Sequence, residues 1–345
     1  MGQPRKHANI PIFIPHLGCP NACVFCDQRT ISGHRAYDPE AVRREIEEVL
    51  GTLGECEHRE IAFFGGSFTG IDRTQMLELL ELAQSYVRRG AVDSIRLSTR
   101  PDYIDEEILT LLSRYAVRTV ELGLQSMDDR VLAASRRGHD SQTAANACAL
   151  IKAHGFDLVG QMMIGLPHSD GPSERMTAER IVELGADAAR VYPTVVFRTT
   201  ELGRMMEQGI YQPLTESETV CRTADVLEIF DRAAIPVIRV GLCASENLSS
   251  DEAVLAGANG SAVGEQAMGE VFYRRMKACL TDAPRGCEAI FRVPMGAASR
   301  AAGHRRYNSL RLCREYGLKR IRIYEEETLQ GYQIQFECNI SDKNA

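Results

Sequence analysis

Short apolar runs alternate with segments of helical periodicity from residue 10 to residue 196, and this alternation constrains the fold most. Six runs predict strands: Ile10–Ile14, Glu60–Phe64, Ser94–Ser98, Thr119–Leu124, Leu158–Ile164 and Ala188–Val196. The segments between them predict helices over 38–51, 72–90, 105–115, most of 128–154, and 173–184. Strand–helix repeats of this kind require a parallel sheet with right-handed crossovers. We therefore expect an α/β fold, either a doubly wound sheet or an incomplete barrel.

Distinctive residues follow the predicted strands at their carboxyl ends, which is where ligands gather in parallel sheets. These residues are Gly65, Gly66 and Ser67, then Thr99–Pro101, Gln125 and Ser126, and Gly165–Pro167. A cysteine-rich loop follows the first strand in the same way. One glycine pair after a strand indicates only a turn, but five such ends together predict a binding site at one edge of the sheet.

Three cysteines, Cys19, Cys23 and Cys26, stand four and then three positions apart directly after the first apolar run. A short loop with this spacing can hold three irons of a 4Fe–4S cluster and leave the fourth iron open to a small chelator. A zinc site with His16 or His34 as fourth ligand is an alternative reading of the spacing. Buried thiols without a metal are a third, because free cysteine packs as a small hydrophobe.

The cysteines and the termini also bear on localisation. Eleven cysteines are an odd number and too dispersed for a secreted disulfide framework, and no signal peptide precedes them. We therefore expect reduced thiols in a cytoplasmic protein. No apolar run approaches the ~18 residues that span a bilayer, so no membrane partner is expected.

A basic segment from Pro284 to Arg322 stands out in a chain of net charge −7. It holds ten Lys or Arg against two acids, Glu288 and Glu315. Such an excess predicts a phosphate-facing surface. The alternative is a solvated face whose charges pair with acidic residues elsewhere.

The pattern changes beyond Phe197, which suggests how the chain is divided. Helices are expected over 200–208 and 216–233, with one more strand over 237–240 and a closing strand-like stretch over 331–338. We expect a tail over residues 1–9, a barrel over 10–243 and an α+β extension over 244–345 that carries the basic segment. Four cysteines of the extension are candidates for an auxiliary cluster, although their spacing fits no short motif: Cys279, Cys287, Cys313 and Cys338.

Motifs in a fixed order carry a family resemblance. The C-x-x-x-C-x-Φ-C pattern, with Phe25 before the last cysteine, resembles the signature of radical S-adenosylmethionine (SAM) enzymes. The stretches that extend the resemblance over roughly residues 10–240 are Ser98–Tyr103, Val120–Ser126, Arg137–Asp140, Gly165–Pro167 and Val191–Val196. They are similar to the radical-SAM domain of the elongator-complex catalytic subunit, which modifies wobble uridines in tRNA. The set also overlaps with the oxygen-independent coproporphyrinogen dehydrogenases.

The resemblance implies a partial (β/α)6 TIM-like barrel that binds a 4Fe–4S cluster on Cys19, Cys23 and Cys26. SAM would chelate the open iron and be cleaved reductively to a 5′-deoxyadenosyl radical. Gly65, Gly66 and Ser67 suit its amino group, and Arg100 or Arg137 its carboxylate, with an ion pair to Glu121 as the alternative role of an arginine. The remaining candidates for cofactor binding are Phe25, Ser98, Gln125 and Gln161. Phe25 would lie beside the adenine or pack the loop against the barrel. Tyr192 is the candidate catalytic residue, with packing as the alternative.

Three departures from these families shape the expected function. The chain has no room for the elongator subunit's acetyltransferase domain, and the coproporphyrinogen enzymes have a C-x-C continuation where this chain has Asp27 and Gln28. They also carry an Asp where this chain has Gln161. We expect a radical SAM enzyme that acts on RNA, in particular tRNA, with an electron donor such as flavodoxin or ferredoxin. The alternatives are a small-molecule substrate, tetrapyrrole-like for example, and a metal-binding scaffold without turnover.

Overall fold

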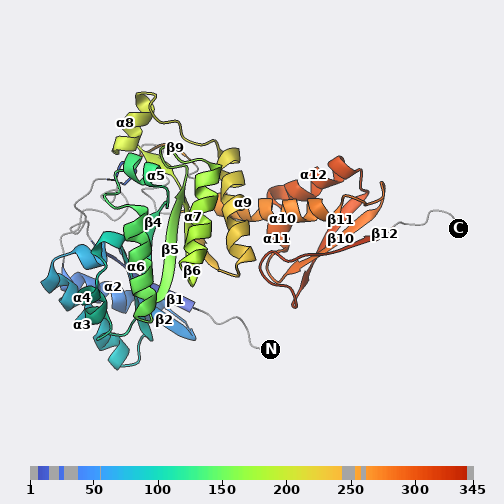
Figure 1. Ribbon diagram of the computed structural model, residues 1–345. Helices are drawn as coiled ribbons and strands as arrows, with labels where there is room; N and C mark the ends of the chain where they lie inside the picture. Colours follow the sequence, from blue (N-terminus) through green and yellow to red (C-terminus); the bar gives the residue numbers. More distant parts are fainter. Residues whose placement is uncertain are drawn as a thin grey trace.

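Seven parallel strands form one sheet in the computed structural model, which describes residues 7–14, 23–26, 38–54, 56–242, 253–257 and 262–339 (Figure 1). The strand order is β1-β2-β3-β4-β5-β6-β8, so each strand lies beside the next one along the chain. The strands are β1 His7–Ile14, β2 His58–Gly65, β3 Ser94–Thr99, β4 Val117–Gln125, β5 Asp157–Ile164, β6 Ala188–Pro193 and β8 Val237–Val240. This sequential order around a curled sheet confirms the predicted partial (β/α)6 barrel, with β8 as an added edge strand.

Helices connect the strands and cover the outside of the sheet, except for α8, which follows β7 and packs against the cysteine turn (Figure 1). They are α2 Pro39–Thr52, α3 Arg73–Arg88, α4 Glu106–Leu112, α5 Asp129–Ala134, α6 Ser141–Ala153, α7 Gly171–Glu183, α8 Glu201–Glu207 and α9 Glu216–Arg232. Several begin at side-chain caps; Asp38 accepts from the Glu40 N–H and Asp72 from the Thr74 and Gln75 N–H groups. Such caps satisfy N–H groups that the helix itself leaves without acceptors. None of the helices in the described ranges is long and apolar enough to cross a membrane.

The two faces of the sheet differ in chemistry because alternate residues of a strand point to opposite sides. The outer face packs against the helices through apolar side chains such as Ile61, Phe63 and Leu97, all fully buried. The inner face carries polar side chains at the alternate positions, including Glu60 and Arg96, which are joined by an ion pair of 2.9 Å. The lumen of the barrel is therefore lined by charge rather than packed with aliphatic groups.

The sixth predicted strand divides into two. Strand β6 ends at Pro193, and β7 Val195–Phe197 pairs antiparallel with β9 Val254–Gly257 in a separate ribbon. The break falls at Thr194, whose N–H and hydroxyl both donate to the Ile164 carbonyl at the end of β5. These two bonds turn the chain out of the sheet at its carboxyl edge.

A smaller α+β module follows, as predicted for the extension. Helix α10 Val263–Cys279 lies beside a three-stranded sheet of order β11-β10-β12, formed by Arg320–Glu326, Glu288–Pro294 and Gln335–Asn339. The short helix α11 Ala298–Ala302 and helix α12 Tyr307–Tyr316 connect β10 to β11. The module has its own core, which includes Phe272, Met276 and Phe291. A boundary near residue 243 stays a prediction.

Helices α9 and α10 join the module to the barrel (Figure 1). Ala224 and Leu227 of α9 and Ala267 and Val271 of α10 form an apolar contact between them. Arg274 of α10 adds ion pairs to two carboxylates of α9, Asp225 at 2.7 Å and Glu228 at 3.6 Å. Helix α10 was not expected from the sequence, yet it is the element that holds the two parts together.

Candidate functional site

The turn from Cys23 to Cys26 lies over the carboxyl ends of the strands and is held by the backbone. Its Cys26 N–H donates to the Cys23 carbonyl at 3.0 Å, and its Val24 N–H donates to the Ser135 carbonyl at 3.2 Å. The Val24 carbonyl accepts from the Leu202 N–H at 2.7 Å. Cys19 lies outside the described residues, as do His16 and His34, so the structure describes two of the three expected ligands.

Two arginines converge on the sulfur of Cys23: Arg100 directly follows strand β3, and Arg137 lies between helices α5 and α6. Nη1 of Arg137 lies 3.3 Å from Cys23 Sγ, and Nη1 of Arg100 lies 3.8 Å from it. Both guanidinium groups are buried, with Arg100 3% and Arg137 5% exposed. Two cationic donors therefore face one sulfur, and this arrangement suits a sulfur that binds a metal.

The two arginines are fixed by further bonds. Arg100 donates from Nε and Nη2 to the Asp102 carboxylate, at 2.9 Å each, and also to the Arg137 carbonyl. Arg137 donates from Nη2 to the Gly123 carbonyl at 2.5 Å, while its buried Nε has no acceptor among the described residues. The alternative from the sequence, an ion pair of Arg137 with Glu121, is not found among the described residues. Glu121 is held instead by Arg96 and Arg190.

Beside the arginines, the predicted residues of β4 and β5 lie together. The Nε2 group of Gln161 donates to Oε1 of Gln125 at 3.4 Å. Gln125 has a φ of 67°, a left-handed conformation that is uncommon for residues other than glycine, at a register shift between β4 and β5. A Cβ at Gly123 would meet Gln125 Nε2 at 3.1 Å and Arg137 Nη2 at 3.5 Å. The missing side chain at Gly123 thus admits both polar groups to the strand end.

The remaining predicted residues divide between the rim and the lumen. Gly65 ends β2 with a φ of 99°, which favours glycine, and the next residues are half-buried Gly66 and buried Ser67. Ser98 faces the lumen, with its Oγ 3.4 Å from Glu121. Phe25 packs against the apolar cluster of Val24, Val196, Leu202 and Tyr211.

Tyr192 faces the lumen from β6. Its hydroxyl accepts from Arg190 Nη1 at 3.1 Å. Burial is the main reason that the pKa of Tyr192 lies above its usual range, and Arg190 opposes it. The phenol therefore keeps its proton at neutral pH.

Sequence reasoning missed the ion pairs that connect these lumen residues. Glu60 and Glu121 are each 1% exposed, and Arg96 lies between them, 2.9 Å from both. Arg190 adds a second cation to Glu121 at 3.0 Å. Alternating charged residues in β2, β3, β4 and β6 were the available signal. Paired buried charges hold these side chains in one geometry, since separating them would leave an uncompensated charge.

The cysteines of the extension do not assemble into a second metal site. All four belong to the core of the C-terminal module or its margin, and the thiols of Cys287 and Cys338 are hydrogen-bonded neighbours. Within the described parts of the chain, one group of three metal-ligating side chains lies close enough together, and it contains no cysteine. These four cysteines therefore contribute to the packed core of the C-terminal module.

His139 is expected to make the stability of the folded protein depend on pH. Burial, aided by the charge of Arg137, lowers the pKa of His139 to about 4 from 6.5. A folded-state pKa below the unfolded value means that stability is full above pH 6.5 and is lost as the pH falls toward 4. We expect the free energy of unfolding to drop by up to about 3 kcal/mol across that window. In the variant His139→Gln this decrease should be smaller. The measurement is the free energy of unfolding in urea at pH 7, 5.5 and 4. An unchanged pH profile would contradict the burial of a neutral imidazole.

Comparisons with known proteins agree with this geometry. A family model described as the radical SAM superfamily matches residues 13–197, and one described as the radical SAM C-terminal domain matches residues 186–271. An uncharacterised protein of Methanocaldococcus jannaschii, MJ0486, is 28% identical over 65% of this chain and 72% of its own. The tRNA uridine(34) acetyltransferase of the same organism is 27% identical over 53% of this chain, and the match spans 38% of that enzyme's length.

A solved structure supports the fold. The structure of Elp3 from Methanocaldococcus infernus superposes with a TM-score of 0.59 at 20% identity, over 80% of this chain and 63% of that one. The first family model covers more than half of the 345 residues, and its members use a 4Fe–4S cluster and SAM. The chain belongs to the radical SAM superfamily and is a radical SAM enzyme.

Proposed function

We propose that this enzyme generates a 5′-deoxyadenosyl radical at the rim of the barrel and uses it to modify RNA, in particular tRNA. The convergence of Arg100 and Arg137 on the Cys23 sulfur is the observation that supports radical generation at this site. A cysteine sulfur that faces two guanidinium groups fits a ligand of an iron–sulfur cluster, which carries negative charge on its sulfurs. When bound, the cluster and SAM supply the electron and the radical precursor.

The protein's own residues have positioning roles in this proposal. Cys19, Cys23 and Cys26 hold the cluster, and Gly65, Gly66 and Ser67 receive the amino group of SAM. Arg137 keeps one donor, Nε, for a further acceptor, for which the carboxylate of SAM is the candidate. Gln125 and Gln161 lie together at the strand ends, where amide groups suit ribose hydroxyls.

In this proposal, residues in the lumen of the barrel and at its mouth face the substrate. Ser98 and Tyr192 point into the lumen from β3 and β6, and we propose that they bound the space in which the radical meets its substrate. The protonated phenol of Tyr192 has a hydrogen to donate. Phe25 shields the cysteine turn from water on its outer side.

The RNA half rests on an exposed surface of the C-terminal module. Five of the ten basic residues expected to face phosphate are neutralised by glutamates: Arg292, Arg300, Arg311, Arg320 and Arg322. In contrast, Arg305, Arg306 and Arg314 are exposed and have no ion pair with any described residue. Tyr307, 62% exposed, and Leu310 lie among them. We call these five residues the α12 surface.

The α12 surface combines the features that bind single-stranded RNA. Arginines contact phosphates, and an exposed aromatic ring offers a face on which a base stacks. Arg305 and Arg306 adopt consecutive left-handed conformations, with φ of 50° and 63°, so the backbone is strained where both side chains project. The surface borders a groove of about 1080 Å³ whose other wall, on α9 and α10, carries Glu216, Glu265 and Glu270. Phosphates are therefore expected on the α12 side alone.

Salt titration tests the RNA half. Binding of bulk tRNA to the reconstituted protein should weaken steeply with salt, and Arg305→Ala/Arg306→Ala should reduce the slope of log affinity against log salt by about 2. Arg88→Ala/Arg118→Ala is the matched control, because it removes two exposed but ion-paired arginines from the barrel. Equal slopes in both variants would remove the α12 surface from the proposal.

A turnover assay tests the whole proposal. The anaerobic protein, given reductant and SAM, should form 5′-deoxyadenosine, and tRNA should change the rate. An electron donor such as flavodoxin or ferredoxin should replace the chemical reductant. Product formation without any tRNA binding would favour a small-molecule substrate instead.

A further inference from the structure

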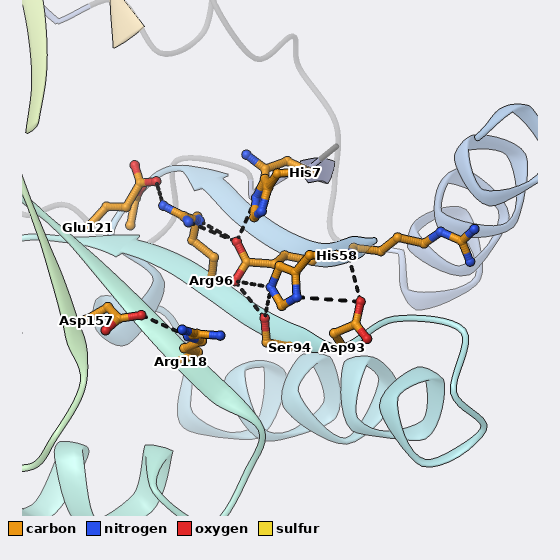
Figure 2. Close-up of polar contacts among 12 residues, drawn as sticks. His7, His58, Asp93, Ser94, Arg96, Arg118, Glu121 and Asp157 are labelled. Carbon is orange, nitrogen blue, oxygen red and sulfur yellow. Dashed lines mark hydrogen bonds and ion pairs between the residues drawn. The ribbon is translucent and has the colours of Figure 1, made fainter. Parts of the chain in front are cut away.

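A cluster of metal-ligating side chains lies at the opposite end of the barrel from the cysteine turn. His7 begins β1, His58 begins β2, and the two are register partners in the parallel pairing (Figure 2). Glu60 follows two positions after His58 on the same face of the strand. One ligating atom of each residue lies within 4.8 Å of the others.

Two distances within the cluster, each to a different oxygen of Glu60, are close to those between ligands of one metal ion, and Nε2 of His7 also lies 2.8 Å from Oδ1 of Asn9. His7 Nε2 lies 3.1 Å from Glu60 Oε2, and His58 Nε2 lies 3.5 Å from Glu60 Oε1. Ligands bound tetrahedrally to zinc at about 2.0–2.1 Å are about 3.3 Å apart. Two histidines and one glutamate also form a donor set that zinc uses with a fourth position open to water.

Neighbouring side chains hold His58 and Glu60 in fixed orientations. Figure 2 shows Asp93 beside His58. The Oδ2 atom of Asp93 lies 3.7 Å from Nδ1 of the imidazole, while Nε2 lies 3.2 Å from Ser94 Oγ and 3.5 Å from Glu60 Oε1. A carboxylate behind the far nitrogen is the usual orienting partner of a metal-bound histidine. Glu60 is 1% exposed and held by Ser94 at 2.6 Å and Arg96 at 2.9 Å, so its carboxylate is fixed in place.

The charge of Arg96 does not exclude a cation here. Arg96 is shared between Glu60 and Glu121, so neither carboxylate has it alone. Ser94 donates to Oε1 of Glu60 and leaves that oxygen a second lone pair, whereas Oε2 receives both Nε and Nη2 of Arg96. Oε1 is therefore the oxygen that can bind a metal ion. His7 is 41% and His58 27% exposed, so the site is open to an entering ion.

We propose that His7, His58 and Glu60 bind a divalent transition-metal ion of the zinc type, which ties strand β1 to β2. Strand β1 is an edge of the barrel sheet and directly precedes the cysteine loop. A metal that crosslinks the starts of the two strands stabilises the edge that presents this loop. The site is separate from the iron–sulfur chemistry, because it lies at the other end of the strands.

Zinc binding to the holoprotein tests the proposal. The cluster is first reconstituted so that its thiolates are occupied, adventitious metal is removed with a weak chelator, and Zn²⁺ is added in equilibrium dialysis. We expect one more zinc per chain in wild type than in His7→Ala or His58→Ala. The thermal midpoint should rise by roughly 5 °C at a hundredfold excess over Kd.

His154→Ala is the matched control, because His154 is a surface histidine paired with Glu106 at 2.7 Å outside the cluster. It should retain the extra zinc and the thermal shift. Zinc binding that persists in both His7→Ala and His58→Ala, or no zinc bound by wild type, would overturn the proposal. Folding of each variant is checked by circular dichroism and by its metal-free thermal midpoint. Asp93→Asn, which keeps all three ligands, should weaken zinc binding about tenfold.

Discussion

Replacing Cys23 by alanine is expected to abolish 5′-deoxyadenosine formation. The Cys23 sulfur is the point on which Arg100 and Arg137 converge, so its loss removes one of the proposed cluster ligands and leaves two buried cations without their shared acceptor. Loss of a partner that merely orients a metal ligand already costs 10–100-fold in metal affinity or activity. We therefore expect a fall of more than about a hundredfold, with iron and sulfide contents well below those of wild type.

The fold should survive this substitution, so the loss is interpretable. The cysteine turn is held by backbone bonds to Ser135 and Leu202, which do not involve the thiol. Cys148→Ala is the control, since it removes another buried thiol, in helix α6, far from the strand ends. Burial raises the pKa of Cys148 to about 12, which marks an inert thiol. Cys148→Ala should keep iron, sulfide and product; a Cys23→Ala protein that does so too would refute the ligand assignment.

The fold was largely predictable because its signals are local. Apolar runs and helical periodicity reveal strands and helices without knowledge of their partners, and parallel pairing follows from their alternation. The single expected strand from Ala188 to Val196 divides because Thr194 bonds to the end of β5, 30 positions away. That contact has no signature in the residues on either side.

The location of the site could be predicted from the sequence, but the contacts between its residues could not. Strand ends meet at one edge in any parallel sheet, so the residues that follow them were expected to lie together. The partner of Arg137 was not predictable, because Cys23 lies 114 positions earlier and comes close only when β1 and β4 take their places. The lumen pairs Arg96–Glu121 and Arg190–Glu121 likewise depend on the register between strands.

Strand register also explains why the basic segment presents less unpaired positive charge than its composition suggests. Parallel pairing of β10 with β11 sets Glu288 opposite Arg320, and both Arg320 and Arg322 pair with that one carboxylate. Charge counted along the chain therefore overestimates charge available to a partner. The three arginines of the α12 surface, which have no ion pair within the described ranges, lie on or beside α12, where no strand neighbour supplies an acid.

Replacing Arg137 by methionine is expected to slow the formation of 5′-deoxyadenosine about a hundredfold at low SAM concentration. Methionine keeps much of the length of the side chain but withdraws one donor from Cys23 Sγ and another from the Gly123 carbonyl. Hydrogen bonds of a charged group contribute about 1.5–3 kcal/mol each, and a hundredfold rate change corresponds to about 2.7 kcal/mol. One such bond therefore accounts for the effect.

The reduction potential distinguishes an electrostatic role of Arg137 from a merely structural one. Removing a positive charge 3.3 Å from the sulfur of the proposed ligand Cys23 should make the cluster harder to reduce, by on the order of 100 mV at an effective dielectric constant of about 20. Arg137→Lys retains the charge and should recover most of the potential while losing the directed fork. Arg136→Met, the exposed neighbour paired with Glu201 at 3.3 Å, should change neither quantity. A wild-type potential in Arg137→Met, together with an unchanged affinity for SAM, would show that the guanidinium supports the fold alone.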